Sequence, residues 1–130
     1  MADEQVQYSV VIPTYRGAPC LPELVERLIT VMSSLGGAYE ILFVDDASPD
    51  DSWKVLTALK DRHAGRAVLR AFRLIRNVGQ FRALMCGLEH ARGEYVITMD
   101  DDLQNPPEEI PKLVSAIREH PKMDAVIGAF

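Results

Sequence analysis

The sequence has few residues that bind transition metals or form disulfides, with two cysteines and three histidines among 130 residues. Cys20 and Cys86 lie far apart, and neither has a second cysteine or a histidine at the spacing that zinc sites use. The pattern argues against a zinc site and a disulfide framework, and it predicts two free thiols. Each histidine lies among polar residues near the end of an expected helix, so none is expected to take part in catalysis.

The chain also lacks an excess of positive charge and a long apolar run. Fourteen Lys and Arg residues are outnumbered by nineteen Asp and Glu residues, which gives a net charge of -5. Because nucleic-acid recognition usually requires a clustered basic surface, nucleic acid is not an expected partner. No stretch approaches the roughly 18 to 20 consecutive apolar residues of a membrane span, and the acidic start of the chain does not resemble a signal peptide. The expected location of the chain as given is cytoplasmic.

What is present is the composition of an ordinary globular protein, with 48% hydrophobic and 25% charged residues. The length suits one domain, and no repeat, linker or low-complexity tract divides it. We therefore expect residues 1–130 to form a single domain.

Short β-branched runs alternate with segments of helical periodicity along the chain. The runs predict strands at residues 8–12, 40–44, 68–74, 95–99 and 124–130. The periodic segments predict helices at residues 21–35, 51–63, 78–91 and from 106–107 to 120. Alternating strands and helices indicate an α/β fold with a mostly parallel sheet that helices cover on both faces. A last strand at 124–130 would leave an exposed sheet edge, through which the chain could self-associate.

Three of the expected strands end in residues suited to ligand binding, at Pro13, at Asp45-Asp46 and at Asp100 to Asp102. Ligands of parallel α/β sheets gather at the carboxyl ends of the strands, so these residues point to a site. Three adjacent carboxylates repel one another unless a cation offsets their charge. Side chains alternate in an extended segment, so Asp100 and Asp102 would point the same way and could share Mg²⁺ or Mn²⁺, with Gln104 one step further. The alternative is a solvated acidic turn.

The other two strand ends are also open to two interpretations. A carboxylate at Asp45 or Asp46 could accept hydrogen bonds from a base or a ribose, or the segment could only form a turn in which Ser48 or Asp50 caps the next helix. Tyr15 could pack on a planar base, although a single tyrosine after a strand commonly only packs against the protein.

Four motifs in order resemble the family 2 glycosyltransferases of GT-A fold. They are Val11 to Tyr15, Val44 to Asp50, Asn77 to Gln80 and Asp100 to Glu108. The segment Asp-Leu-Gln-Asn-Pro-Pro-Glu is most similar to the polyprenyl-phosphate glycosyltransferases, which include dolichyl-phosphate mannose synthase-like and undecaprenyl-phosphate sugar transferases. The resemblance covers about residues 8–130. Where the family usually has Tyr-Asn-Glu, this chain has Tyr15-Arg16-Gly17, so an acidic contact from the last position is absent.

The resemblance implies inverting transfer of a sugar from a nucleotide diphosphate sugar to a polyprenyl phosphate. It assigns Asp100 and Asp102 as catalytic residues that hold Mg²⁺ or Mn²⁺ together with Gln104, and it places Asp101 in the diphosphate pocket. By the same resemblance Pro13, Tyr15, Val44 and Asp46 would hold the nucleoside, with UDP expected and GDP as the alternative. The chain would be the nucleotide-binding N-terminal half of a longer enzyme at the cytoplasmic face of the membrane, truncated at its C-terminus. A phosphate acceptor is already an anion, so no strong general base is required.

Three other classes of protein share part of this pattern. A non-catalytic nucleotide-sugar-binding module, or an inactive fragment, would share the same cleft. A phosphate-accepting receiver domain would need a lysine at the end of its last strand, and a dinucleotide-binding oxidoreductase would need GxGxxG after its first strand. The sequence has neither feature. The identity of the sugar does not follow from it.

Overall fold

The computed structural model describes residues 5–128 as one parallel sheet with helices on both faces. The strands are β1 (Tyr8–Thr14), β2 (Tyr39–Asp45), β3 (Val68–Arg73) and β4 (Tyr95–Thr98). The helices are α1 (Leu21–Leu35), α2 (Ser52–Arg62), α3 (Gln80–His90) and α4 (Ile110–Glu119), with a 3-10 turn, η1 (Pro107–Glu109), before α4. The strand order is β3-β2-β1-β4, and every neighbouring pair is parallel. The predicted α/β class is confirmed.

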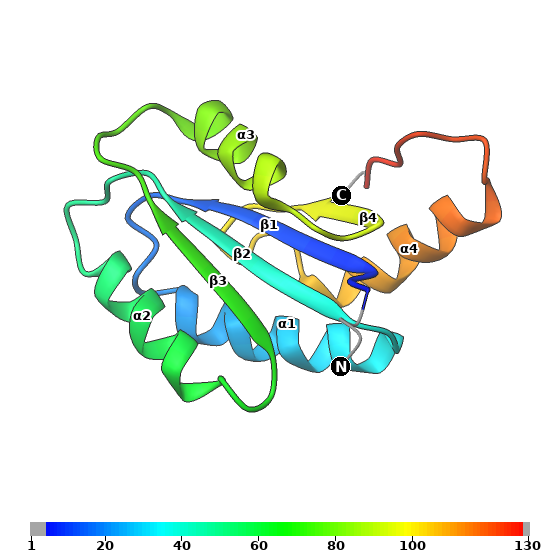
Figure 1. Ribbon diagram of the computed structural model, residues 1–130, viewed down its shortest axis with the longest axis horizontal. Helices are drawn as coiled ribbons and strands as arrows, with labels where there is room; N and C mark the ends of the chain where they lie inside the picture. Colours follow the sequence, from blue (N-terminus) through cyan, green and yellow to red (C-terminus); the bar gives the residue numbers. More distant parts are fainter. Residues whose placement is uncertain (1–4, 129–130) are drawn as a thin grey trace.

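The main core lies between the sheet and the layer of helices that contains α1, α2 and α4 (Figure 1). β1 lies in the interior of the sheet, and all seven of its residues are buried. Val10 and Ile12 of β1 point toward this layer and pack with Leu24 and Leu28 of α1. The apolar stripe that predicted α1 from the sequence is therefore the surface that the helix buries.

The opposite face of the sheet is covered by α3 alone among the described helices (Figure 1). A Cβ atom at Gly87 would lie 2.4 Å from Cγ1 of Val11 and 3.2 Å from Cγ2 of Val44. Glycine at this position lets α3 approach β1 and β2 closely. None of the helices within residues 5–128 is long and apolar enough to cross a membrane.

The predicted strand at 124–130 is wrong for the residues that the structure describes. Residues 124–128 form no strand, and residues 129–130 lie outside the described range. The apolar run Ala125-Val126-Ile127 fits a strand, but a strand also needs a backbone partner, and these residues instead line a hollow beside β4. Within residues 5–128 the sheet edge on this side is therefore β4, which pairs with β1.

Candidate functional site

A polar cleft of about 400 Å³ lies at the carboxyl ends of β1, β2 and β4. It is lined by Pro13, Thr14, Tyr15, Asp46, Asn77, Gly79, Gln80, Asp100, Asp101 and Asp102. The parallel strands bring segments together that are separated by more than 80 residues in the sequence, since β1 and β4 are neighbours. The structure thus gathers six of the residues that the sequence singled out, from Pro13 to Asp102, around one cavity.

Two of the expected site residues do not line the cleft. Val44 is fully buried, and its side chain faces α3 near Gly87. Gln104 is exposed and lies outside the cleft, because Leu103 has a φ of 64° and turns the chain after Asp102. The alternation that extended the predicted metal site to Gln104 assumed an extended backbone, which ends before this residue.

The three adjacent aspartates differ in their surroundings. Asp100 is exposed, and its Oδ1 accepts a hydrogen bond of 2.8 Å from Nε2 of Gln80. Asp102 is also exposed, and its Oδ1 accepts the backbone N–H of Gln104 at 3.1 Å. Asp101 is partly buried and accepts a hydrogen bond from Oγ1 of Thr14, at the end of β1. The three carboxylates therefore have different partners, and Asp101 is the one that is bonded to a neighbouring strand.

Burial also affects the protonation of Asp101. Desolvation raises the pKa of this carboxyl above its ordinary value, although hydrogen bonds from Thr14 and the backbone of Tyr15 partly offset the effect. Space for the carboxylate exists because residue 17 is glycine, where an added Cβ would lie 2.3 Å from Oδ2 of Asp101. The side chain of Asp101 thus lies against the turn that carries Gly17.

The remaining acidic pair offers a donor set that fits a magnesium or manganese ion. Within residues 5–128 no three His, Cys, Asp or Glu side chains converge on a preformed metal site. Asp100 and Asp102 nevertheless both line the cleft. Mg²⁺ commonly binds proteins through one or two carboxylates and completes its shell with water and substrate phosphate. Two carboxylates beside an open cavity suit such an ion, with its other ligands supplied by a diphosphate.

Asp46 is more strongly tied to the protein than the sequence suggested. Its side chain is 3% exposed. Its Oδ1 accepts the backbone N–H of Val78 at 2.8 Å, and its Oδ2 accepts that of Gly79 at 2.9 Å and Nδ2 of Asn77 at 3.0 Å. Asp46 therefore holds the loop before α3, and this is a role that its place at a strand end did not reveal.

The turn after β1 is held by two hydroxyl groups from the segment that follows β2. Oγ of Ser48 accepts the backbone N–H of Arg16 at 2.9 Å, and Oγ of Ser52 accepts that of Gly17 at 3.1 Å. Asp50 accepts both the backbone N–H and the hydroxyl of Ser52 at the start of α2. The N-cap residue of α2 is Asp51, and no side chain makes a capping hydrogen bond there, so the predicted capping by Ser48 or Asp50 is wrong. The turn after β1 carries Tyr15, a residue that is 46% exposed and lines the cleft.

Thr14 and Gln80 line the cleft and were not identified as site residues from the sequence. Thr14 follows Pro13 inside the first motif, and Gln80 ends the motif Asn77 to Gln80. Their positions within two of the four motifs were the available signal. Their partners, Asp101 and Asp100, come from the last motif and become visible only in the folded chain.

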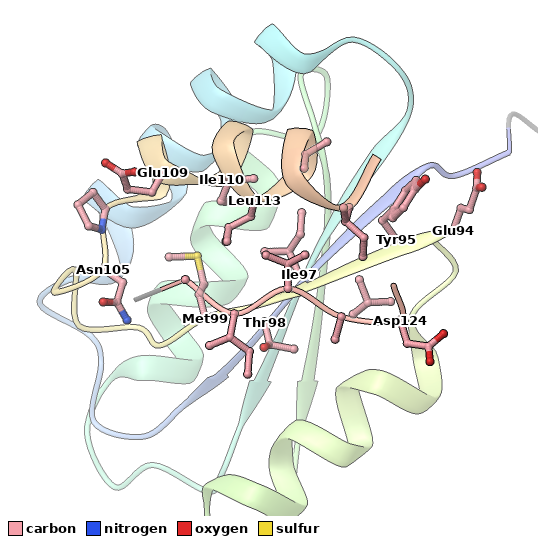
Figure 2. A pocket seen from close by; sticks show the side chains of 18 residues that line it. Glu94, Tyr95, Ile97, Thr98, Met99, Asn105, Glu109, Ile110, Leu113 and Asp124 are labelled. Carbon is pink, nitrogen blue, oxygen red and sulfur yellow. The ribbon is translucent and has the colours of Figure 1, made fainter. Parts of the chain in front are cut away.

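A larger hollow of about 620 Å³ lies elsewhere, between β4, α4 and residues 124–128 (Figure 2). Most of its lining residues are apolar, among them Ile97, Met99 and Leu113. The side chains shown in Figure 2 do not bring a group of carboxylates or donors together at one point. Size alone therefore does not make it the functional site, and the polar cleft remains the candidate.

The fold and the cleft first define a class of protein, a ligand-binding α/β domain with its site at the carboxyl edge of an open parallel sheet. The family follows from the sequence as a whole. Residues 9–130 match the family described as "Glycosyl transferase family 2", and the chain belongs to this family.

Two relatives carry the same description, undecaprenyl-phosphate 4-deoxy-4-formamido-L-arabinose transferase. The protein from Sodalis glossinidius is 51% identical over 106 residues, which are 82% of this chain and 32% of that protein. The protein from Klebsiella pneumoniae (strain 342) is 49% identical over 111 residues, which are 85% of this chain and 33% of that protein. The chain thus spans about a third of the length of these relatives.

Solved structures share this fold. The mannosyltransferase PcManGT from Pyrobaculum calidifontis, in complex with GDP-Man and Mn²⁺, has a TM-score of 0.73 and 23% identity, over 89% of this chain and 36% of that chain. S. aureus TarS 1-349 in complex with UDP has a TM-score of 0.68 and 23% identity, over 96% of this chain and 38% of that chain. At these identities the likeness concerns the fold.

Proposed function

We propose that this chain forms the donor-binding part of a metal-dependent, inverting glycosyltransferase that transfers a sugar from a nucleotide diphosphate sugar to a polyprenyl phosphate. One observation carries the proposal: Asp100 and Asp102 share a cleft with Tyr15 and Asp46 in a chain of glycosyl transferase family 2. The polyprenyl acceptor is supported by the undecaprenyl-phosphate named in the descriptions of both relatives.

The residues of the cleft divide into a metal end and a nucleoside end. Asp100 and Asp102 would hold Mg²⁺ or Mn²⁺, which when bound offsets negative charge on the diphosphate. Asp101 ties this end to β1 through Thr14. At the nucleoside end, Pro13 shapes the turn and the exposed ring of Tyr15 packs on the base.

Asp46 contributes to the nucleoside end chiefly by fixing the loop at residues 77–79, which lines the same cleft. A carboxylate has about four acceptor sites, and three are taken by this loop. The remaining site on Oδ1 can still accept a bond from a base or a ribose, so direct contact and loop anchoring are compatible.

The chemistry of the acceptor explains why the cleft needs no histidine. A polyprenyl phosphate is an anion at neutral pH and attacks without first losing a proton to a strong base. No histidine lines the cleft within the described part of the chain. The protein therefore contributes orientation and charge compensation, and the leaving group is a nucleoside diphosphate.

UDP is the first donor nucleotide to test, and GDP is the second. The sugar named by the two relatives, 4-deoxy-4-formamido-L-arabinose, is the first sugar to test. Since the donor is soluble and the acceptor is a membrane lipid, we place the full-length enzyme at the cytoplasmic face of the membrane. Self-association through the open edge of β4 is a further proposal, which sedimentation over a range of concentrations would check.

Calorimetric titration with UDP and GDP, each with Mn²⁺ and then with EDTA, tests the donor assignment. We expect one nucleotide to bind in the presence of Mn²⁺ and the binding to disappear with EDTA. The double variant Asp100→Ala/Asp102→Ala should lose this metal-dependent affinity while keeping the wild-type circular dichroism spectrum. Unchanged affinity in that variant would refute the metal assignment.

A transfer assay separates the enzyme from a binding module. The chain is incubated with the radiolabelled nucleotide sugar, Mn²⁺ and undecaprenyl phosphate in detergent, beside a longer protein that contains it. Label that enters the lipid fraction supports transfer. Metal-dependent nucleotide binding without labelled lipid in either sample would favour the non-catalytic module.

A further inference from the structure

The contact between Gln80 and Asp100 links α3 to the metal end of the cleft. Gln80 is the first residue of α3, and its Nε2 donates to Oδ1 of Asp100 at 2.8 Å. Both side chains line the cleft. We propose that Gln80 is a positioning residue that orients the Asp100 carboxylate toward a divalent cation, an inference that rests on the proposed function.

The amide of Gln80 has the right chemistry for this role. A neutral N–H donor fixes one carboxylate oxygen without cancelling the negative charge, whereas a lysine or arginine would place a cation where the metal ion must bind. The bond occupies Oδ1 and leaves Oδ2 of Asp100 available as a ligand. Partners of this kind commonly hold metal-binding side chains in place.

The backbone that carries Gln80 is fixed by a buried group. Gly79, directly before it, has a φ of 96° and donates its N–H to Asp46, as does Val78. The Asp46 side chain is 3% exposed, so these bonds are shielded from water. The start of α3 is thus held at the nucleoside end while the Gln80 side chain reaches to the metal end.

The other two aspartates of the triplet are oriented from elsewhere. Asp102 is bonded to the backbone of the following turn, and Asp101 to Thr14 of β1. Of the three, Asp100 is the one whose hydrogen-bond donor comes from α3, and removal of the Gln80 amide removes that donor. The effect of a substitution at Gln80 should therefore be confined to Asp100.

The test titrates Mn²⁺ alone into the ¹⁵N-labelled chain and follows the broadening of the backbone amide signals around Asp100. Gln80→Met keeps the length of the side chain and removes the donor. We expect it to weaken Mn²⁺ binding about tenfold, at the lower end of the range for such partners because the contact is exposed. The control is Phe81→Leu, at the next position of α3, where the side chain is 73% exposed and does not line the cleft.

Two NMR signals distinguish orientation of Asp100 from general damage to the loop. The side-chain amide signal of Gln80 should shift in the variant Asp100→Asn. The backbone signals of Val78 and Gly79 should stay in place in Gln80→Met, since their bonds to Asp46 do not involve residue 80.

The outcomes separate this inference from the proposed function. If the wild-type chain binds Mn²⁺ and Gln80→Met binds it within about twofold, the positioning role is overturned while the metal site stands. Equal weakening in Phe81→Leu would also overturn it. If the wild-type chain binds no Mn²⁺, with or without UDP, the metal assignment fails together with the inference.

Discussion

Asp100, Asp101 and Asp102 are the same residue type, but the folded chain gives them different surroundings. Asp100 and Asp102 are exposed in the cleft, whereas Asp101 is partly buried against Thr14. Burial disfavours the charged form of Asp101 and raises the pKa of this carboxyl. The difference arises from the contacts that each side chain makes in the segment after the end of β4.

Gly17 is required by the same contact. An added Cβ would lie 2.3 Å from Oδ2 of Asp101 and 2.5 Å from Oγ1 of Thr14, which is closer than atoms can pack. We expect Gly17→Ala to lower the free energy of unfolding by about 1 to 3 kcal/mol, measured by urea denaturation.

A matched glycine and a second substitution make this prediction specific. Gly65→Ala places a methyl group where no heavy atom lies within 4 Å, so it should change stability by less than about 0.5 kcal/mol. Gly17→Ala/Asp101→Ala should recover part of the loss, because it removes one of the two clashing side chains. Equal stability of Gly17→Ala and Gly65→Ala would contradict the contact.

At the scale of elements, the loop before α3 depends on one carboxylate. Asp46→Asn replaces one of the acceptors of the N–H groups of Val78 and Gly79 with a donor. We expect the free energy of unfolding to fall by about 1 to 3 kcal/mol, as for other buried hydrogen bonds to a charged group. Hydrogen exchange at these two amides should accelerate more than at amides of β1.

Asp61→Asn is the control for this change, because Asp61 is exposed in α2 and its substitution should leave both amides and stability unaffected. Exchange at Val78 and Gly79 that matches wild type in Asp46→Asn would show that the loop is held by other contacts.

The elements were more predictable from the sequence than the contacts between them. Periodicity identified β1 and α1 because each buries a regular stripe of apolar residues. The run at 124–130 has the same local pattern without a backbone partner in the described residues, and Gln104 lies beyond a left-handed residue that no periodicity reveals. Local pattern determines which segments can be strands, and pairing determines which of them are.

The sequence predicted which residues lie at the site better than it predicted their hydrogen-bond partners. Asp46 and Asp100 were predicted as site residues because each follows an expected strand, and the structure places both in one cleft. The bonds of Asp46 to a loop more than 30 residues away, and of Asp101 to Thr14 across 87 residues, depend on strand order. Strand order is a property of the whole sheet, so these roles required the structure.

At the scale of the whole molecule, the two ends of the sheet carry different polar groups. The carboxyl ends of the strands form the open cleft, while Glu40 is 1% exposed near the opposite end. Its Oε2 accepts the hydroxyl of Ser9 at 2.6 Å and the backbone N–H of Arg92 at 2.7 Å, and its Oε1 accepts Nη1 of Arg70 at 3.0 Å. One buried carboxylate therefore joins β1, β2, β3 and the segment that leads into β4.

This network makes the free energy of unfolding depend on pH. Burial alone would raise the pKa of Glu40, but the bonds from Ser9, Arg92 and Arg70 outweigh it and hold the pKa below its ordinary value of 4.5. A carboxyl with a lowered pKa in the folded state stabilises the fold fully above its unfolded pKa. That contribution is lost as the pH falls through the lower folded value.

The variant Glu40→Gln should therefore be less stable than wild type by about 2 kcal/mol at pH 7, since the amide replaces an acceptor of several donors. Urea denaturation of both proteins, repeated from pH 7 downward, should show this difference shrinking below the ordinary pKa of 4.5 as the wild-type carboxyl takes up a proton. Glu94→Gln, an exposed site in the same region, should follow wild type throughout. If the stability difference between wild type and Glu40→Gln stays constant with pH, the packing of the side chain at position 40, and not its charge, holds the four segments together.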